Sequence, residues 1–203
     1  RLRARLRSLE VADRTMVWFA SDNGPVGGKR VPDAPGSAGP FRGHKSTLFE
    51  GGIRVPGLVE WPDSVRPGTT TRFPASTLDY LPTILAAVGG QLPDKRPVDG
   101  INLLPVLAGQ GGQRGVPIAF EHRKQAALIT DRYKLLQAPS HDRTSTDQPT
   151  EAADGYLLFD LIADPAETDD LSETHGELVE RLATILREWQ SSCQRDRTGE
   201  AAP

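Results

Sequence analysis

Two adjacent oxygen-bearing side chains, Asp22 and Asn23, follow an uninterrupted apolar run in this chain. The run, Met16 to Ala20, is typical of a strand buried on both faces of a parallel sheet. Because ligands of open α/β sheets bind just past the carboxyl ends of strands, the pair lies where a site is expected. A carboxylate beside an amide oxygen suits a hard divalent cation such as calcium or magnesium. The same residues also fit an Asx turn that binds no metal.

The next candidate is a cationic side chain, Lys45, which follows a loop rich in Gly and Pro over residues 26–43. Loops of this length in compact domains are usually functional or disordered. A mobile ammonium group near a metal-binding loop can neutralise a tetrahedral oxyanion such as sulfate or phosphate. Arg42 and His44 flank Lys45 as further anion contacts. The alternative is a surface lysine without a role, the usual state of charged side chains.

The first half of the chain is expected to form an α/β domain around the strand that precedes Asp22. Hydrophobic spacing predicts helices or strands over residues 1–10, 16–20, 53–61, 76–88 and 103–107. The helix near residue 76 begins with a capping box, Ser76 to Asp79, and ends at Gly89. Pro82 lies inside this helix and predicts a kink unless the first turn is irregular.

The second half of the chain changes character after the segment 109–115, whose composition is that of a domain boundary. Four short strand-like runs follow, at Pro117–Glu121, Ala126–Thr130, Tyr133–Gln137 and Tyr156–Leu161. Asp131-Arg132 is short enough to be a hairpin turn, and an apolar stripe over residues 178–189 predicts a helix against the sheet. Strands grouped before one helix indicate a small α+β subdomain with an antiparallel sheet. The expected boundaries are an α/β domain over 1–112, the α+β subdomain over 113–192 and a polar tail over 193–203.

Composition excludes several classes of protein. With 37% hydrophobic residues, the 203-residue chain can bury a core. The formal net charge of −3 gives no electrostatic case for binding nucleic acid or an anionic membrane. No apolar run approaches the ~20 residues needed to cross a bilayer. The single cysteine, Cys193, excludes an intrachain disulfide.

The candidate residues lie in segments that resemble, in order, the type I sulfatases of the alkaline-phosphatase-like superfamily. These segments are Ser21–Pro25, Phe41–Lys45, Phe49–Pro56, Leu78–Leu85, Asp99-Gly100, Tyr133–Leu135, Leu158–Leu161 and Asp164–Thr168. Each is short, but their shared order over most of the chain is a specific signal. The resemblance implies the carboxyl-terminal portion of such an enzyme. It comprises part of an alkaline-phosphatase-like α/β sandwich with a central mixed or parallel sheet, then an α+β subdomain with an antiparallel sheet and one long helix.

The resemblance also implies roles for single residues. In sulfatases the Asp and Asn of the Ser-Asp-Asn-Gly motif are two of four oxygen ligands to calcium, sometimes magnesium, and Asp22 and Asn23 match them. The Lys of the Arg-Gly-x-Lys motif contacts the sulfate ester, and Lys45 matches it as a catalytic and substrate-binding residue. His44, beside Lys45, and His122, after the first strand of the subdomain, are further candidates for substrate contact. The implied activity is arylsulfatase-like sulfuric ester hydrolysis of a sulfated sugar, glycan or aryl substrate.

One part of the family pattern has no counterpart in the chain. The sulfatase nucleophile is a formylglycine made from a Cys or Ser in a Cys/Ser-x-Pro/Ala-x-Arg motif, and no such motif is visible. Cys193 has an arginine at the right separation, but Arg195 replaces the central Pro or Ala, and the segment falls in the expected polar tail. We therefore expect the nucleophile and the other metal ligands upstream of Arg1, and no turnover by the isolated chain.

Two other interpretations stay open. A phosphoryl or phosphonate ester hydrolase of the same superfamily would also place a nucleophile beside metal ions, although such enzymes commonly use two cations with His and Asp ligands. A non-catalytic fragment or pseudoenzyme that binds only a metal or a sulfated glycan is compatible with the missing nucleophile. By resemblance, bacterial relatives are often periplasmic or secreted, and the sequence does not indicate an oligomeric state.

Overall fold

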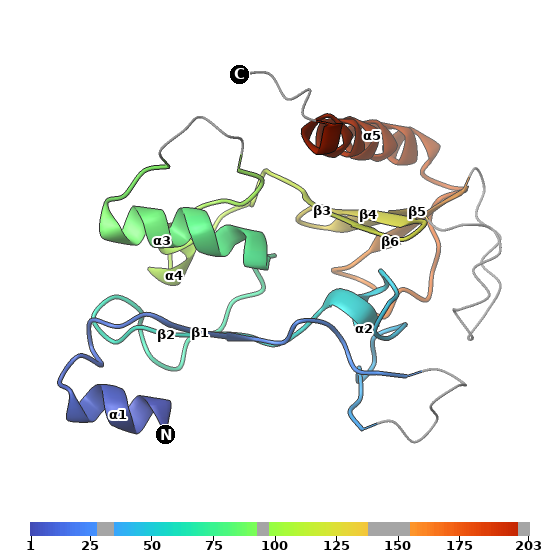
Figure 1. Ribbon diagram of the computed structural model, residues 1–203. Coiled ribbons are helices and arrows are strands. Elements are labelled where there is room, and N and C mark those ends of the chain that lie inside the picture. Colours follow the sequence, from blue (N-terminus) through green and yellow to red (C-terminus); the bar gives the residue numbers. More distant parts are fainter. Residues whose placement is uncertain (28–34, 93–97, 138–154, 199–203) are drawn as a thin grey trace. The chain divides into compact units, whose positions relative to one another are not determined.

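The computed structural model describes residues 1–27, 35–92, 98–137 and 155–198 (Figure 1). The chain forms two compact units, one of Arg1–Ser21 with Pro56–Ile118 and the other of Asp22–Val55 with Ala119–Pro203. The polypeptide therefore leaves the first unit immediately before the candidate metal-binding pair. It returns to the first unit only after Val55. The domain boundaries expected from composition stay a prediction, because a compact unit is a set of contacts and not a functional domain.

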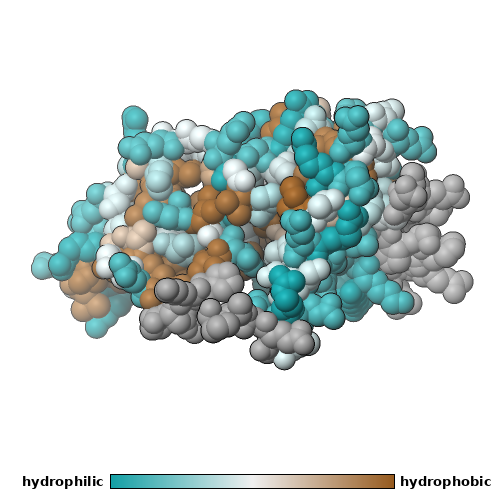
Figure 2. Space-filling view, turned by 90° about the horizontal axis from the view of Figure 1, so that it is seen from above, coloured by the Kyte–Doolittle hydropathy of each residue, from teal (hydrophilic) through white to brown (hydrophobic). Residues whose placement is uncertain are grey.

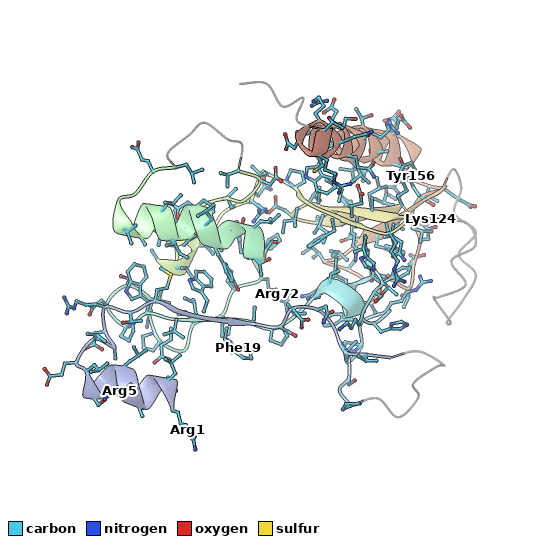
Figure 3. All side chains as sticks on the ribbon, viewed as in Figure 1. Arg1, Arg5, Phe19, Arg72, Lys124 and Tyr156 are labelled. Carbon is cyan, nitrogen blue, oxygen red and sulfur yellow. The ribbon has the colours of Figure 1, made fainter. Side chains whose placement is uncertain are left out.

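A two-stranded sheet organises the first unit. Strand β1 (Val17–Ala20) pairs antiparallel with β2 (Gly57–Glu60). The predicted strand is confirmed, but its expected parallel pairing and burial on both faces are wrong. Phe19, labelled in Figure 3, is 61% exposed, and its cross-strand neighbour Leu58 is 62% exposed. In the described part of the chain this sheet has two strands, so no third strand or layer covers these side chains.

The helices of the first unit begin and end largely as predicted. Helix α1 (Leu2–Ser8) comes before the sheet, a 3₁₀ turn η1 (Thr77–Asp79) leads into α3 (Tyr80–Val88), and a short α4 (Leu104–Leu107) follows. The predicted capping box is confirmed at η1, and Gly89 ends α3 in the left-handed conformation with φ 65°. Pro82 lies in the first turn of α3, where a backbone N–H has no intrahelical partner, so the helix accommodates it.

A buried ion pair fixes the start of α3. Arg114 donates from Nη1 and Nη2 to the two carboxylate oxygens of Asp79 at 2.7 and 2.8 Å. The same carboxylate accepts hydrogen bonds from the backbone amides of Ser76 and Ile101, each at 2.8 Å. Burial raises the pKa of Asp79, but the hydrogen bonds from Arg114 and the two amides outweigh it, so the pKa lies below its ordinary value. Asp79 therefore joins three separate segments as a carboxylate.

A four-stranded antiparallel sheet organises the second unit, as predicted. Its strands, in the order β3-β4-β5-β6, are Ile118–His122, Gln125–Ile129, Tyr133–Gln137 and Tyr156–Asp160. The turn predicted at Asp131-Arg132 is confirmed, since the Thr130 amide donates to the Tyr133 carbonyl at 2.9 Å. The predicted long helix is α5 (Gly176–Thr198). It extends beyond the expected start of a polar tail, and Cys193 lies within it, because polar residues with adequate helix propensity continue the last turns.

Both faces of this sheet are covered, which explains its burial pattern. One face packs against α5, with Leu135 and Leu158 in contact with Leu182 and Leu186. The opposite face packs against the segment that includes Phe49 and the single-turn helix α2 (Glu50–Ile53). Figure 1 shows α5 and α2 on opposite sides of the sheet, and Figure 3 shows side chains filling both layers.

Residues 53–61 were expected to form one strand, and only Gly57–Glu60 does so.

Hydrophobic side chains also reach the surface. On α3 the exposed residues include Leu81, Ile84 and Val88, and hydrophobic surface is visible as brown patches among hydrophilic residues in Figure 2. Among the helices of the described ranges, none combines the length and the apolar character that a membrane span requires.

Candidate functional site

The turn that contains Asp22 and Asn23 is attached to helix α2. The amide of the next residue, Gly24, donates to the carbonyl of Gly52 at 2.8 Å. Gly24 is buried, and a β-carbon at this position would overlap the carbonyl of Gly51. Only glycine lets the two backbones approach this closely. The side chain of Asp22 is exposed and that of Asn23 is half-buried, so both can meet a ligand from solvent.

The loop that contains Lys45 is attached to the same turn and the same helix. The Lys45 amide donates to the Pro25 carbonyl at 2.9 Å, and the Gly51 amide donates to the Arg42 carbonyl at 2.6 Å. A tight turn shapes the loop, in which Thr47 Oγ1 donates to the His44 carbonyl at 2.8 Å. The Lys45 residue is exposed. The two predicted site segments, far apart along the chain, therefore share one backbone framework.

The two candidate histidines occupy different positions. His44 lies in the Lys45 loop, and its Nδ1 is 2.8 Å from the Lys45 carbonyl oxygen. A β-carbon built on Gly27 would lie 3.1 Å from the His44 β-carbon, which places His44 beside the segment that follows Asn23. His122 ends strand β3, and its buried Nε2 has no hydrogen-bond partner among the residues that the structure describes. The framework thus brings together five of the six candidate residues, Arg42 included, while His122 belongs to the sheet.

An ionic cluster anchors α2 to the sheet. The Lys134 ammonium lies 3.1 Å from Glu50 Oε1 and 2.8 Å from Glu167 Oε1, and the second contact is an ion pair outside hydrogen-bond geometry. The Lys134 and Glu167 side chains are 0% exposed. Glu167 Oε2 accepts the Glu50 amide at 2.6 Å, and Arg54 Nη1 lies 3.3 Å from Glu50 Oε2. Lys134, Glu50 and Glu167 are called the ionic cluster below. Both of its carboxylates have a cationic partner.

Burial is the largest influence on the protonation of Glu167 within the ionic cluster. Desolvation raises the pKa of the Glu167 carboxyl above its ordinary value, and the opposing effects of Lys134 and the Glu50 amide do not cancel it. Sequence reasoning assigned no role to these residues. One signal was present, because Lys134 is a charged residue at an inward-facing position of the apolar strand β5.

Comparison with known proteins identifies the family of this framework. The family model described as Sulfatase matches residues 1–90, which include the Asp22–Asn23 turn, Lys45 and α2. N-acetylgalactosamine-6-sulfatase of Homo sapiens is 44% identical over an alignment that covers 89% of this chain and 38% of the human protein. This chain belongs to the sulfatase family.

Further comparisons agree in sequence and in fold. Arylsulfatase A of Bos taurus is 35% identical over 89% of this chain and 38% of the bovine protein. The crystal structure of Ps i-CgsB in complex with k-i-k-neocarrahexaose superimposes with a TM-score of 0.76 at 29% identity, over 93% of this chain and 39% of that chain. The fold is the α/β fold of the alkaline-phosphatase-like sulfatases, as predicted. The chain spans about two fifths of the length of the relatives that it matches.

The donor atoms of this sulfatase chain fit part of a site for a hard cation. A carboxylate and an amide oxygen, from Asp22 and Asn23, are the ligand types that calcium and magnesium prefer. Calcium binds six to eight oxygen atoms, and the ranges that the structure describes hold no cluster of three or more His, Cys, Asp or Glu side chains suited to a metal ion. The pair therefore fits as a fraction of a larger set of ligands.

The close packing around α2 gives a first prediction. Substitution Gly51→Ala is expected to lower the thermal stability of the sulfatase by several degrees, because a β-carbon there would lie 2.5 Å from the carbonyl oxygens of Arg42 and Gly43. Gly57→Ala is the matched control, since a β-carbon at Gly57 meets no atom within 4 Å. Thermal unfolding of both variants checks the prediction. Equal melting temperatures would contradict the close approach described at Gly51.

Proposed function

We propose that this chain contributes part of the active centre of a sulfuric ester hydrolase. The observation that supports the proposal is the shared framework of the Asp22–Asn23 turn and the Lys45 loop. Both segments are joined to α2 through the amides of Gly24 and Gly51. The backbone positions of Asp22, Asn23 and Lys45 are therefore fixed relative to one another. Their two oxygen ligands and one ammonium group are the combination that a hard cation and a sulfate group require.

Each residue has a distinct role in the proposal. Asp22 and Asn23 would hold calcium, or magnesium as in some relatives of the family. When bound, such a cation polarises an ester oxygen and stabilises negative charge that develops in the transition state. Lys45 would bind the sulfate oxygens directly, and its long, exposed side chain suits a point contact with an anion. His44, from the same loop, is proposed as an additional substrate contact, and so is His122.

The nucleophile is proposed to lie in polypeptide beyond these 203 residues. The family resemblance implies a formylglycine, and the only cysteine of the chain, Cys193, is placed in α5, after the sheet and far along the chain from α2. The short coverage of the relatives is compatible with this proposal. The isolated chain should then bind ligands without turnover.

The substrate is proposed to be a sulfate ester of a sugar or an aryl alcohol. The relatives support this class by name, since the human protein is an N-acetylgalactosamine-6-sulfatase and the bovine protein an arylsulfatase. The structure of Ps i-CgsB was obtained with k-i-k-neocarrahexaose. A sulfated glycan and a small aryl sulfate are therefore both reasonable test substrates.

The deciding experiment compares ester classes with the full-length protein that contains this chain. It is expected to hydrolyse a chromogenic aryl sulfate, to lose that activity on chelation, and to recover it when Ca²⁺ or Mg²⁺ is restored. A matched phosphate monoester and a phosphonate ester should react far more slowly. Faster cleavage of either would favour the phosphoryl hydrolase instead, and binding of Ca²⁺ without any hydrolysis would indicate a non-catalytic protein. Aryl sulfate hydrolysis by the 203-residue chain alone would refute the placement of the nucleophile.

A further inference from the structure

The ionic cluster includes Glu50 of α2, the helix to which both site segments are joined, and has no role in the chemistry proposed above. Within it, Glu167 contacts both ends of the segment that presents Lys45. Its carboxylate accepts a hydrogen bond from the amide of Glu50 at 2.6 Å, after Lys45 in sequence. Its carbonyl oxygen accepts one from Nη1 of Arg42 at 3.2 Å, before Lys45. Glu167 thus holds the segment from Arg42 to Glu50 at both of its ends.

The same anchor extends to the candidate metal ligands. Helix α2 begins at Glu50, and the carbonyl of Gly52 in that helix accepts the amide of Gly24, the residue that follows Asn23. Because α2 is a single turn, its position depends on what holds its first residue. A shift of Glu50 would displace the metal-ligand turn and the Lys45 loop together.

The backbone at Glu167 indicates that its side chain is needed there. Glu167 has φ +59°, in the left-handed region that glycine adopts without strain. A glutamate in this conformation is disfavoured, and its side chain is also fully buried. The backbone conformation and the burial both disfavour a glutamate at this position. The contacts of its carboxylate with Lys134 and with the Glu50 amide explain why a glutamate is nevertheless found there.

We propose that Glu167 is a positioning residue, which sets the placement of Lys45 and of the Asp22–Asn23 turn through Arg42 and Glu50. The inference rests on the proposed function, which gives these residues a sulfate and a cation to bind. It adds a distinct requirement, namely that the segment after β6 controls the affinity for both ligands. Loss of the Glu167 charge should then weaken the two affinities together.

The test uses the full-length protein with Glu167→Gln. Glutamine keeps the shape and an oxygen acceptor for the Glu50 amide but removes the charge that pairs with Lys134. We expect calorimetry to show about tenfold weaker binding of Ca²⁺ and of inorganic sulfate. This is the effect typical of residues that orient the ligand-binding residues without contacting the ligand. The KM for an aryl sulfate should rise in parallel, at temperatures well below the melting temperature of the variant.

The matched control is Asp160→Asn, which removes an ion pair of the same sheet. Asp160 Oδ2 accepts Arg132 Nη2 at 2.7 Å, and its other oxygen accepts the amides of Ile162 and Ala163. We expect this variant to melt at a lower temperature with unchanged affinity for Ca²⁺ and sulfate. The pair of variants separates a loss of stability from a loss of positioning.

The outcomes decide between the two roles. A folded Glu167→Gln variant with native affinities would overturn the positioning role, whatever its melting temperature. If Glu167→Gln does not fold, Glu167→Asp serves instead, because the shorter side chain keeps the charge but withdraws the carboxylate from the Glu50 amide. Native affinities in that variant would also overturn the inference. Failure of the unmodified protein to bind Ca²⁺ and sulfate would overturn the proposed function, and the inference with it.

Discussion

Replacing Lys45 with alanine is expected to lower kcat/KM of the full-length sulfatase for an aryl sulfate by about 10²- to 10³-fold, the loss typical of removing one preorganised charge-stabilising group. The proposed contact with the sulfate oxygens gains strength as negative charge develops, so kcat should fall as well as the affinity for substrate. Steady-state kinetics over a range of substrate concentrations measures both. Because the Lys45 side chain is exposed, its loss should leave the fold intact.

Lys124 is the matched control for Lys45. It is an exposed lysine between β3 and β4, labelled in Figure 3, and its removal changes the net charge by the same amount. Lys124→Ala should keep native kinetics. If Lys45→Ala and Lys124→Ala lose equal activity, the effect is one of overall charge, and the assignment of Lys45 to the sulfate is wrong. Lys45→Arg should recover part of the activity, since it restores the charge with a different shape.

Short-range patterns in the sequence were sufficient for the elements whose signals are local. The capping box at Ser76, the four strands of the second sheet and α5 each follow from neighbouring residues, and the structure confirms them. The strand before Asp22 was also predicted, but not the exposure of Phe19. An apolar run shows that a strand forms, whereas its burial depends on layers that a local pattern does not contain.

Contacts between distant segments account for what sequence reasoning missed. Helix α2 contains Gly51 and Gly52, which are poor helix formers, and it exists because it packs on a sheet formed much later in the chain. The ionic cluster joins Glu50 to Lys134 and Glu167, which are separated from it by 84 and 117 positions. Family motifs contained all three residues, but only the folded chain shows that they meet.

The second large effect is expected from the centre of the ionic cluster. Lys134→Met should lower the free energy of unfolding by about 3–5 kcal/mol, because it leaves two buried carboxylates, Glu50 and Glu167, without their shared cation. Methionine matches the volume of the lysine stem, so a cavity contributes little to the loss. Denaturant unfolding at pH 7 measures the change. The control Arg132→Met removes an exposed partner of Asp160 and should lower the free energy of unfolding far less than Lys134→Met does.

Charge, rather than shape, should explain the Lys134 effect, and two comparisons test this. Neutralising both carboxylates in Lys134→Met/Glu50→Gln/Glu167→Gln should recover part of the lost stability, because no unpaired charge then stays buried. The pH dependence provides the second comparison. Since the folded-state pKa of Glu167 lies above its unfolded value, the stability linked to its protonation is present below the unfolded pKa and is lost as pH rises through the folded pKa. Lys134→Met should therefore regain stability relative to the unmodified protein as pH falls from 7 towards 5, and a constant difference would contradict the electrostatic explanation.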